Sequence, residues 1–276
     1  MTNTQLYDQK DVSGPRRFRL FHIIPPHLYA NILSFLNLCC GIAGCIAIKV
    51  NHNAPMAFSL MFLGQFLDLF DGRAAEKWGS TPNGDLLDDI ADGTSFGICV
   101  SFVIFSSFTD SRIGLIVALI HASSTIFRLV RFVIRKRGAG VTGGVAFFSG
   151  MPCPAGALVV GSAAIVFPQE KQWELVKLTI CILTSILTVS TVTYPHFGRY
   201  LIKLVNREVF YSLLSFTAGT VFTALFFGRW MLLIYYIHVM SLIYLISPCF
   251  ARYAERERNY VTDRNEDQLA DKKKAE

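Results

Sequence analysis

The sequence has few charged residues, and its cysteines do not have the spacing of a zinc or redox site. Charged residues make up 17% of the 276 positions and hydrophobic residues 52%, a balance that is unusual for a soluble domain. The seven cysteines lie in or beside apolar segments without any CxxC pair, so we interpret them as small buried side chains. The first ten residues are polar, and we therefore expect no cleavable secretory signal.

Long apolar runs are what the sequence does contain, and each is about as long as a bilayer is thick. They predict an all-α integral membrane protein with about eight transmembrane helices. The predicted spans are 27–48, 54–75, 86–108, 113–134, 152–167, 175–194, 209–227 and 231–250.

These spans divide the chain into four parts. Residues 1–26 would be a cytoplasmic segment with a short interfacial amphipathic helix, ended by two prolines. Residues 27–205 would form a six-helix core, and residues 206–251 would add two further transmembrane helices. Residues 252–276 would be a charged cytoplasmic tail.

Basic residues are distributed unevenly between the two sides of this predicted bundle. The side opposite the N-terminus holds only five of the 26, namely Lys49, Arg112, Lys171, Lys177 and Arg229. Because cytoplasmic loops are rich in Lys and Arg, both termini are predicted to be cytoplasmic. Topology and lipid anchoring explain the net charge of +6. Basic and aromatic residues do not interleave as in single-strand binders, so we expect no nucleic-acid partner.

Four aspartates lie at the adjoining ends of two neighbouring spans: Asp68 and Asp71 end the second, and Asp88 and Asp92 begin the third. Spacings of three and four residues place each pair on one helix face, and the short connection makes the helices antiparallel neighbours. Carboxylates so close to a bilayer are costly and repel one another unless a cation lies between them. Solvated acids at helix ends are the alternative. Hard oxygen ligands suit Mg²⁺, Mn²⁺ or Ca²⁺. Two such metal ions bound next to each other would suit phosphoryl transfer.

The stretch Asp68-Leu-Phe-Asp71-Gly72-Arg-Ala-Ala75-Glu76, followed by Gly84-x3-Asp88-x3-Asp92, resembles the motif of the CDP-alcohol phosphotransferase family. That motif reads DGxxAR between two aspartates and then GxxxDxxxD. One position departs from it, because Glu76 replaces the arginine; Arg73 and Lys77 are the nearby cations.

The resemblance implies roles for the matched positions. Two divalent cations, Mg²⁺ or Mn²⁺ with Ca²⁺ as an alternative, would be bound by Asp68, Asp71, Asp88 and Asp92. Asp92 would also be the general base. The cytidine diphosphate would lie against Asp68, Gly72, Ala75 and Gly84.

Four further stretches resemble the phosphatidylserine synthases of that family. They are Gly93-Thr-Ser-Phe-Gly97, Arg128-Leu-Val-Arg131-Phe132, Ser149-Gly-Met-Pro-Cys-Pro-Ala155 and Val189-Ser190 with Tyr194-Pro-His-Phe197. The resemblance implies that the phosphatidyl group of CDP-diacylglycerol passes to the hydroxyl of L-serine, releasing CMP. It also implies a homodimer, among the lipids of a membrane that we expect to be a prokaryotic cytoplasmic membrane.

Four residues are candidates for the headgroup or phosphate pocket. Arg128 and Arg131 lie on one helix face and can bind carboxylate or phosphate bidentately, although anchoring to lipid headgroups is the alternative. Thr94 and Ser95 follow Asp92 directly, and helix packing is the alternative for both.

Two other functions remain open. A sister enzyme that uses choline, inositol phosphate or glycerol phosphate would share the aspartate frame. A multi-span transporter is the other alternative, but transporters often show inverted repeats and binding sites at the membrane midplane. This sequence has no internal repeat, and its aspartates lie at one predicted depth.

Overall fold

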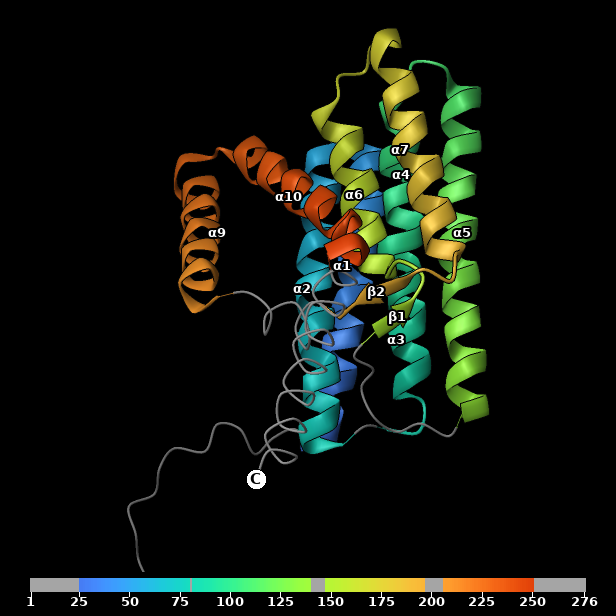
Figure 1. Cartoon of the computed structure of the whole chain (residues 1–276), viewed down its shortest axis with the longest axis vertical. Helices are drawn as coiled ribbons and strands as arrows, with labels where there is room; N and C mark the ends of the chain where they lie inside the picture. Colours follow the sequence, from blue (N-terminus) through green and yellow to red (C-terminus); the bar gives the residue numbers. More distant parts are fainter. Residues whose placement is uncertain (1–24, 80, 140–146, 197–205, 251–276) are drawn as a thin grey trace, which may run out of the picture.

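A computed structural model describes residues 25–79, 81–139, 147–196 and 206–250, and most of them are helical (Figure 1). The predicted interfacial helix and the predicted charged tail fall outside these residues, apart from Pro25 and Pro26. The described chain opens with a short 3₁₀ turn, η2 (Pro26–Leu28), which leads directly into the first long helix.

Each of the eight predicted spans overlaps a helix. The helices are α1 (Tyr29–Asn51), α2 (Ala54–Trp78), α3 (Gly84–Asp92), α4 (Val100–Ser107), α5 (Ser111–Ala139), α6 (Cys153–Val166), α7 (Lys171–Val189), α9 (Arg207–Phe227) and α10 (Trp230–Leu245). A π-helical segment, η3 (Gly93–Cys99), joins α3 to α4 without a break.

Four helical stretches in the described part of the chain are long and apolar enough to cross a membrane. They are Pro26–Asn51, Gly84–Ser107, Ser111–Arg135 and Lys171–Val189, while α6 and α10 are shorter apolar helices. Their outer faces expose Phe, Leu and Ile side chains, as expected for a surface that meets lipid. The protein is therefore a helical, multi-pass membrane protein, and the count of eight spans stays a prediction.

A tight turn sets α1 and α2 side by side. His52 takes a left-handed conformation with a φ of 50°, and the side chain of Asn53 accepts a hydrogen bond from the Met56 amide at 2.9 Å. This caps α2 at its first turn. Pro55 lies in the same turn, where a main-chain N–H would have no partner within the helix, so the missing N–H of proline is tolerated. The two helices then run antiparallel, so the beginning of α1 lies beside the end of α2 that carries the aspartates.

A two-stranded sheet corrects the all-α prediction. Strand β1 (Phe147–Ser149) pairs antiparallel with β2 (Thr193–Pro195), and Phe148 lies opposite Tyr194. Strands of three residues are too short to produce an alternating pattern that sequence analysis can recognise. The sheet joins the approach to α6 with the exit from α7.

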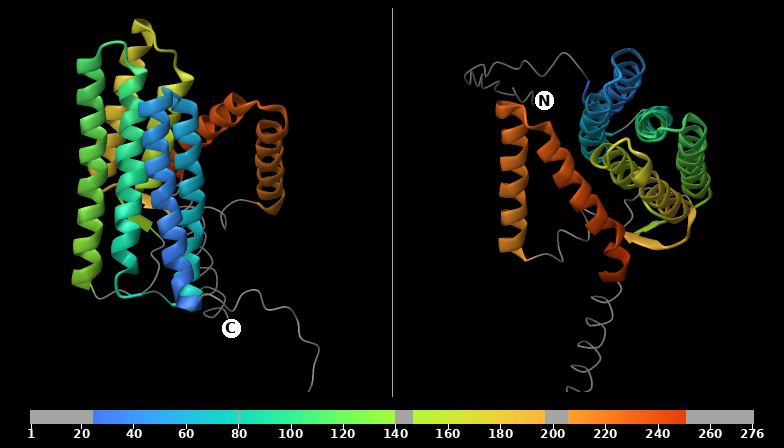
Figure 2. Two further views of the ribbon diagram at one scale, coloured as in Figure 1. Left: turned by 180° about the vertical axis from the view of Figure 1, so that it is seen from behind. Right: turned by 90° about the horizontal axis from the view of Figure 1, so that it is seen from above.

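Helix α10 is tied to this sheet and to α6 by hydrogen bonds. The Tyr194 hydroxyl donates to the Leu245 carbonyl at 3.2 Å, and the Tyr244 hydroxyl donates to the Pro195 carbonyl at 3.0 Å. The Ser162 hydroxyl of α6 lies 2.9 Å from Nδ1 of His238. Helix α9 packs against α10 and stands apart from the rest of the bundle (Figures 1 and 2).

Candidate active site

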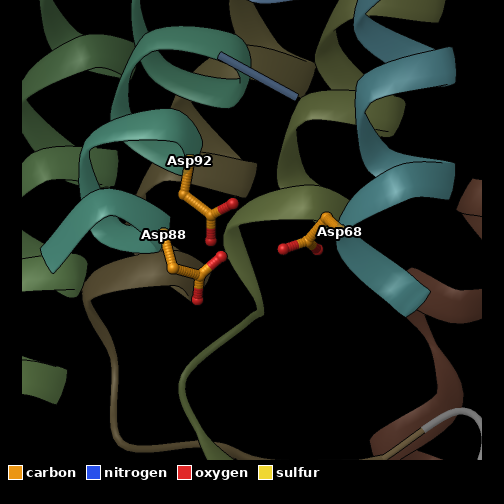
Figure 3. Close-up of side chains that lie close together, drawn as sticks. All are labelled: Asp68, Asp88 and Asp92. Atoms are coloured by element: carbon orange, nitrogen blue, oxygen red, sulfur yellow. The ribbon is translucent and has the colours of Figure 1, made fainter. Parts of the chain in front are cut away.

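Three of the four aspartates converge. Asp68 comes from α2, and Asp88 and Asp92 come from successive turns of α3 (Figure 3). Each is half-buried, and each offers one carboxylate oxygen such that the three oxygens lie within 4.8 Å of one another. The expectation that the two helices bring their carboxylates face to face is therefore confirmed for these three residues.

The fourth aspartate lies beside this trio. Asp71 is buried, with 5% of its surface exposed, and its Oδ2 accepts a hydrogen bond from the Ser34 hydroxyl at 2.7 Å. Its carboxylate also lies against that of Asp88. Asp71 thus belongs to the same acidic group, although one of its oxygens is already bound by α1.

The donor set of this group fits a hard divalent cation. Oδ1 of Asp88 is buried and has no hydrogen-bond partner in the described part of the chain, and a buried polar atom without a partner is costly. Neighbouring carboxylates at this separation also repel one another. A bound cation would relieve both costs, and oxygen-only ligands are those that Mg²⁺, Mn²⁺ and Ca²⁺ prefer.

A polar stripe on α1 also reaches the acidic group, and our sequence analysis missed it. The stripe consists of Asn31, Ser34 and Asn37. Asn31 donates to the Thr81 hydroxyl at 2.7 Å, and Asn37 donates to Oδ1 of Asp92 at 3.4 Å. Polar residues repeated every third position in an apolar run are visible in the sequence and mark one helix face. That repeat was the signal available.

The positions expected to contact cytidine diphosphate lie along the same end of the bundle. Gly72 is exposed, and a β-carbon added to it would meet no atom of the described residues within 4 Å. Asp68, Gly72 and Ala75 share one face of α2 because they are four and three residues apart. Gly84 is buried at the first residue of α3. The face of α2 beyond Asp68 is therefore open to a bulky group.

The departure from the family motif lies one turn further along α2. Glu76 is exposed near the end of that helix. The two nearby cations lie over aromatic rings, with Arg73 5.9 Å from the ring centroid of Phe70 and Lys77 4.8 Å from that of Trp78. Both cations are exposed, so positive charge is still present at the surface around Glu76.

The two arginines of α5 have different environments, although the sequence predicted a common role. Arg128 is 8% exposed and interacts electrostatically with Asp68. Its Nη1 lies 3.5 Å from Sγ of Cys153, and its guanidinium carbon lies over the rings of Phe132 and Phe148 at 5.6 and 5.7 Å from their centroids. Arg128 of α5 is therefore close enough to the acidic group to interact with its charge.

Arg131 instead binds main-chain carbonyls. Its Nη1 donates to the Val189 carbonyl, and its Nη2 lies 2.9, 3.3 and 3.1 Å from the carbonyl oxygens of Ser149, Thr188 and Ser190. Because both terminal nitrogens are occupied, these contacts give Arg131 a structural role at the C-terminal end of α7, where a cation is favourable. These contacts favour a structural role for Arg131 over the predicted role beside Arg128 in an anion pocket.

We expect replacement of Arg131 by methionine to lower the free energy of unfolding by about 1–3 kcal/mol, because several carbonyls lose a charged donor. Thermal unfolding of the purified protein in detergent would measure this as a lower Tm. The matched control is Arg135→Met, which removes an exposed arginine one turn along the same helix and should leave the Tm unchanged. Equal Tm values for both variants would contradict the structural role.

Gly150 makes this arrangement possible. Its φ is 83°, and a β-carbon there would lie 2.5 Å from the Thr188 carbonyl oxygen and 2.7 Å from Nη2 of Arg131. Glycine is therefore required both by conformation and by space. The Ser149-Gly150-Met151-Pro152 stretch resembles part of the serine enzymes. In this structure it packs against Arg131 and the end of α7, and it leads directly to Cys153, which contacts Arg128.

The two hydroxyl residues after Asp92 are bound within the protein. The Ser95 hydroxyl is fully buried and donates to the Asn37 carbonyl at 3.0 Å, and the Thr94 hydroxyl donates to the Ile90 carbonyl at 2.8 Å. These contacts favour the helix-packing alternative for Ser95, whereas Thr94 remains half-buried beside Asp92.

The π-helical segment η3 begins directly after Asp92. Such segments are rare and occur frequently at functional sites. The buried His121 of α5 lies with Nε2 3.0 Å from the Phe96 carbonyl oxygen inside the segment. No feature of the sequence indicated this change of helical geometry.

Comparisons with known proteins show which family this chain belongs to. The chain is 25% identical over 232 residues to the CDP-diacylglycerol–serine O-phosphatidyltransferase of Mycobacterium leprae, covering 82% of this chain and 76% of the relative. It is 32% identical over 170 residues to the protein of that name from Methanocaldococcus jannaschii, covering 61% and 74%. It is 30% identical over 169 residues to the archaetidylserine synthase of Methanothermobacter thermautotrophicus, covering 60% and 68%. The family model described as CDP-alcohol phosphatidyltransferase matches residues 27–190, which include the whole acidic group. The chain belongs to the CDP-alcohol phosphatidyltransferase family.

Proposed function

We propose that this protein transfers the phosphatidyl group of CDP-diacylglycerol to the hydroxyl of L-serine, giving phosphatidylserine and CMP. The observation that carries the proposal is the convergence of Asp68, Asp88 and Asp92 in the aspartate frame of the family. The relatives named as serine phosphatidyltransferases support serine as the acceptor.

The acidic group would hold two divalent cations, Mg²⁺ or Mn²⁺, with Ca²⁺ as an alternative. The ligands would be Asp68, Asp71, Asp88 and Asp92. When bound, such ions neutralise charge on the diphosphate oxygens and on the departing CMP. The cytidine diphosphate would lie along the open face of α2 at Gly72 and Ala75, close to Gly84 at the start of α3.

The protein's own side chains would do the rest of the chemistry. Asp92 would accept the proton of the serine hydroxyl, and the oxygen would form a bond to the lipid-side phosphorus. The bond between that phosphorus and the diphosphate bridging oxygen would break, and CMP would leave with the electron pair. Arg128 faces Asp68 from α5 and would bind the serine carboxylate or the lipid phosphate through its planar guanidinium.

The distribution of basic residues supports one orientation of the protein in the membrane. We propose that both termini and the acidic group face the cytoplasm, where serine and the CDP headgroup of the lipid would be accessible. A prokaryotic cytoplasmic membrane and a homodimer are part of the same proposal.

A panel of acceptor alcohols tests the assignment. Purified protein in detergent, supplied with CDP-diacylglycerol and Mn²⁺, should release CMP with L-serine. Choline, inositol phosphate and glycerol phosphate should be at least about 100-fold slower, because a site built to bind one polar acceptor rejects others that leave its groups unpaired. CMP release with one of these alcohols and none with serine would identify a sister enzyme. Absence of CMP release with every alcohol would contradict the transferase itself.

A further inference from the structure

Asn37 connects three elements at the acidic group. It lies in the middle of α1 and is fully buried. Its side-chain amide donates to Oδ1 of Asp92 at 3.4 Å, and its main-chain carbonyl accepts the hydroxyl hydrogen of Ser95 at 3.0 Å. A buried side-chain amide among apolar helices costs free energy unless it forms hydrogen bonds. Here its donor points at the proposed general base.

The other side of the amide is pressed against α2. A β-carbon added to Gly64 would lie 2.5 Å from Oδ1 of Asn37, and that oxygen has no hydrogen-bond partner in the described part of the chain. The reversed amide would point its oxygen at a carboxylate, which is repulsive. The amide orientation is therefore fixed by Asp92 on one side and by the small residue Gly64 on the other.

We propose that Asn37 is a positioning residue that orients the carboxylate of Asp92, and that Gly64 provides the space for it. With one Asp92 oxygen held by the amide, the other can turn toward Asp68 and Asp88. Asparagine suits this role because its amide donates a hydrogen bond without adding charge to a group of four carboxylates. The inference rests on the proposed function for its kinetic test, but it also predicts metal affinity.

The experiment compares full-length variants purified in detergent. Asn37→Ala removes the donor, and Asn37→Leu removes it while keeping a side chain that branches at the same carbon. Each should lower kcat for CMP release by about 10- to 100-fold and leave the KM for CDP-diacylglycerol within about threefold. Each should also weaken Mn²⁺ binding, measured by calorimetry, because groups that orient metal ligands typically contribute factors of this size.

Gly64→Ala tests the same link from the other side. The added methyl would displace the Asn37 amide, so kcat and Mn²⁺ affinity should fall in the same direction. The matched control is Gly219→Ala, which adds a methyl to α9 where no atom of the part of the chain that the structure describes lies within 4 Å, and it should leave both quantities unchanged. Because Gly64→Ala acts through Asn37, adding it to Asn37→Ala should cause less loss than the two single effects multiplied.

Wild-type kcat and Mn²⁺ affinity in a folded Asn37→Leu protein would overturn the proposal. So would fully multiplicative effects of Asn37→Ala and Gly64→Ala. If the Ala variant does not fold, the Leu variant, whose side chain has the same branched shape, still decides. If the wild-type protein releases no CMP with any alcohol, the proposed function fails, whereas the Mn²⁺ titrations still test whether Asn37 orients Asp92.

Discussion

Replacement of Asp92 by asparagine is expected to lower CMP release from CDP-diacylglycerol and serine by roughly 10³-fold. Asparagine has nearly the same size as aspartate, so its packing against Asn37, Asp68 and Asp88 is kept, but an amide cannot accept the serine proton. General bases typically contribute about 10²- to 10⁴-fold to a rate, and 10³-fold corresponds to about 4 kcal/mol of transition-state stabilisation. Steady-state CMP release measures the effect, which should appear in kcat.

The control for this variant is Asp110→Asn. Asp110 lies just before α5, where its carboxylate accepts a hydrogen bond from the Arg112 amide at 2.8 Å, and it is not part of the acidic group. Its replacement should leave kcat within about twofold of wild type. The Asp92→Asn protein should unfold at a temperature no lower than wild type, since one repulsive charge has been removed. A kcat within tenfold of wild type would exclude Asp92 as the base.

Removal of divalent cations is expected to abolish CMP release. Three carboxylate oxygens within 4.8 Å of one another repel each other in the absence of a cation, and the lipid diphosphate would add further negative charge beside them. Protein treated with a chelator should lose activity by at least about 10³-fold, because several kcal/mol of charge stabilisation are lost. Addition of Mg²⁺ or Mn²⁺ in excess should restore it.

Two further measurements make this test specific. Asp88→Asn should raise the Mn²⁺ concentration needed for half-maximal activity, because it removes an oxygen ligand that has no partner within the described protein. Arg135→Met, at the exposed end of α5, should not change it. Mass spectrometry should first show that the chelated protein holds far less than one metal ion per chain. Full activity of that protein would contradict the metal requirement.

The sequence was sufficient to predict the arrangement of the aspartates. Spacings of three and four residues on two helices joined by a short connection determine which carboxylates can meet. Long apolar runs likewise predict where helices lie, since a helix of about 20 residues matches the bilayer. These features depend on local spacing, and local spacing can be read directly from a sequence.

Other parts of the site depend on contacts between distant residues. Arg128 and Arg131 lie on the same helix face, so their spacing gives them the same predicted role. The contacts of Arg131 with carbonyls at the end of α7 are what distinguish it from Arg128, which interacts with the acidic group. The pairing of β1 with β2 joins segments more than 40 residues apart. The α1 stripe was different, because its three-residue repeat was present in the sequence, and its meaning depended on recognising Asp71 and Asp92 as the partners of Ser34 and Asn37.

The π-helical segment after Asp92 lets one long helix accommodate an extra residue between α3 and α4. Each residue of an α-helix turns the chain by about 100°, and a π turn includes one residue more than an α turn. A single-residue deletion within Gly93–Cys99 would therefore restore the α-helical repeat and leave α4 with nearly the same rotation relative to Asp88 and Asp92. Relatives that are one residue shorter here would keep both the place of their acids and the face of α4 that packs in the bundle. Sequence alignments of the family should accordingly be allowed a gap at this point.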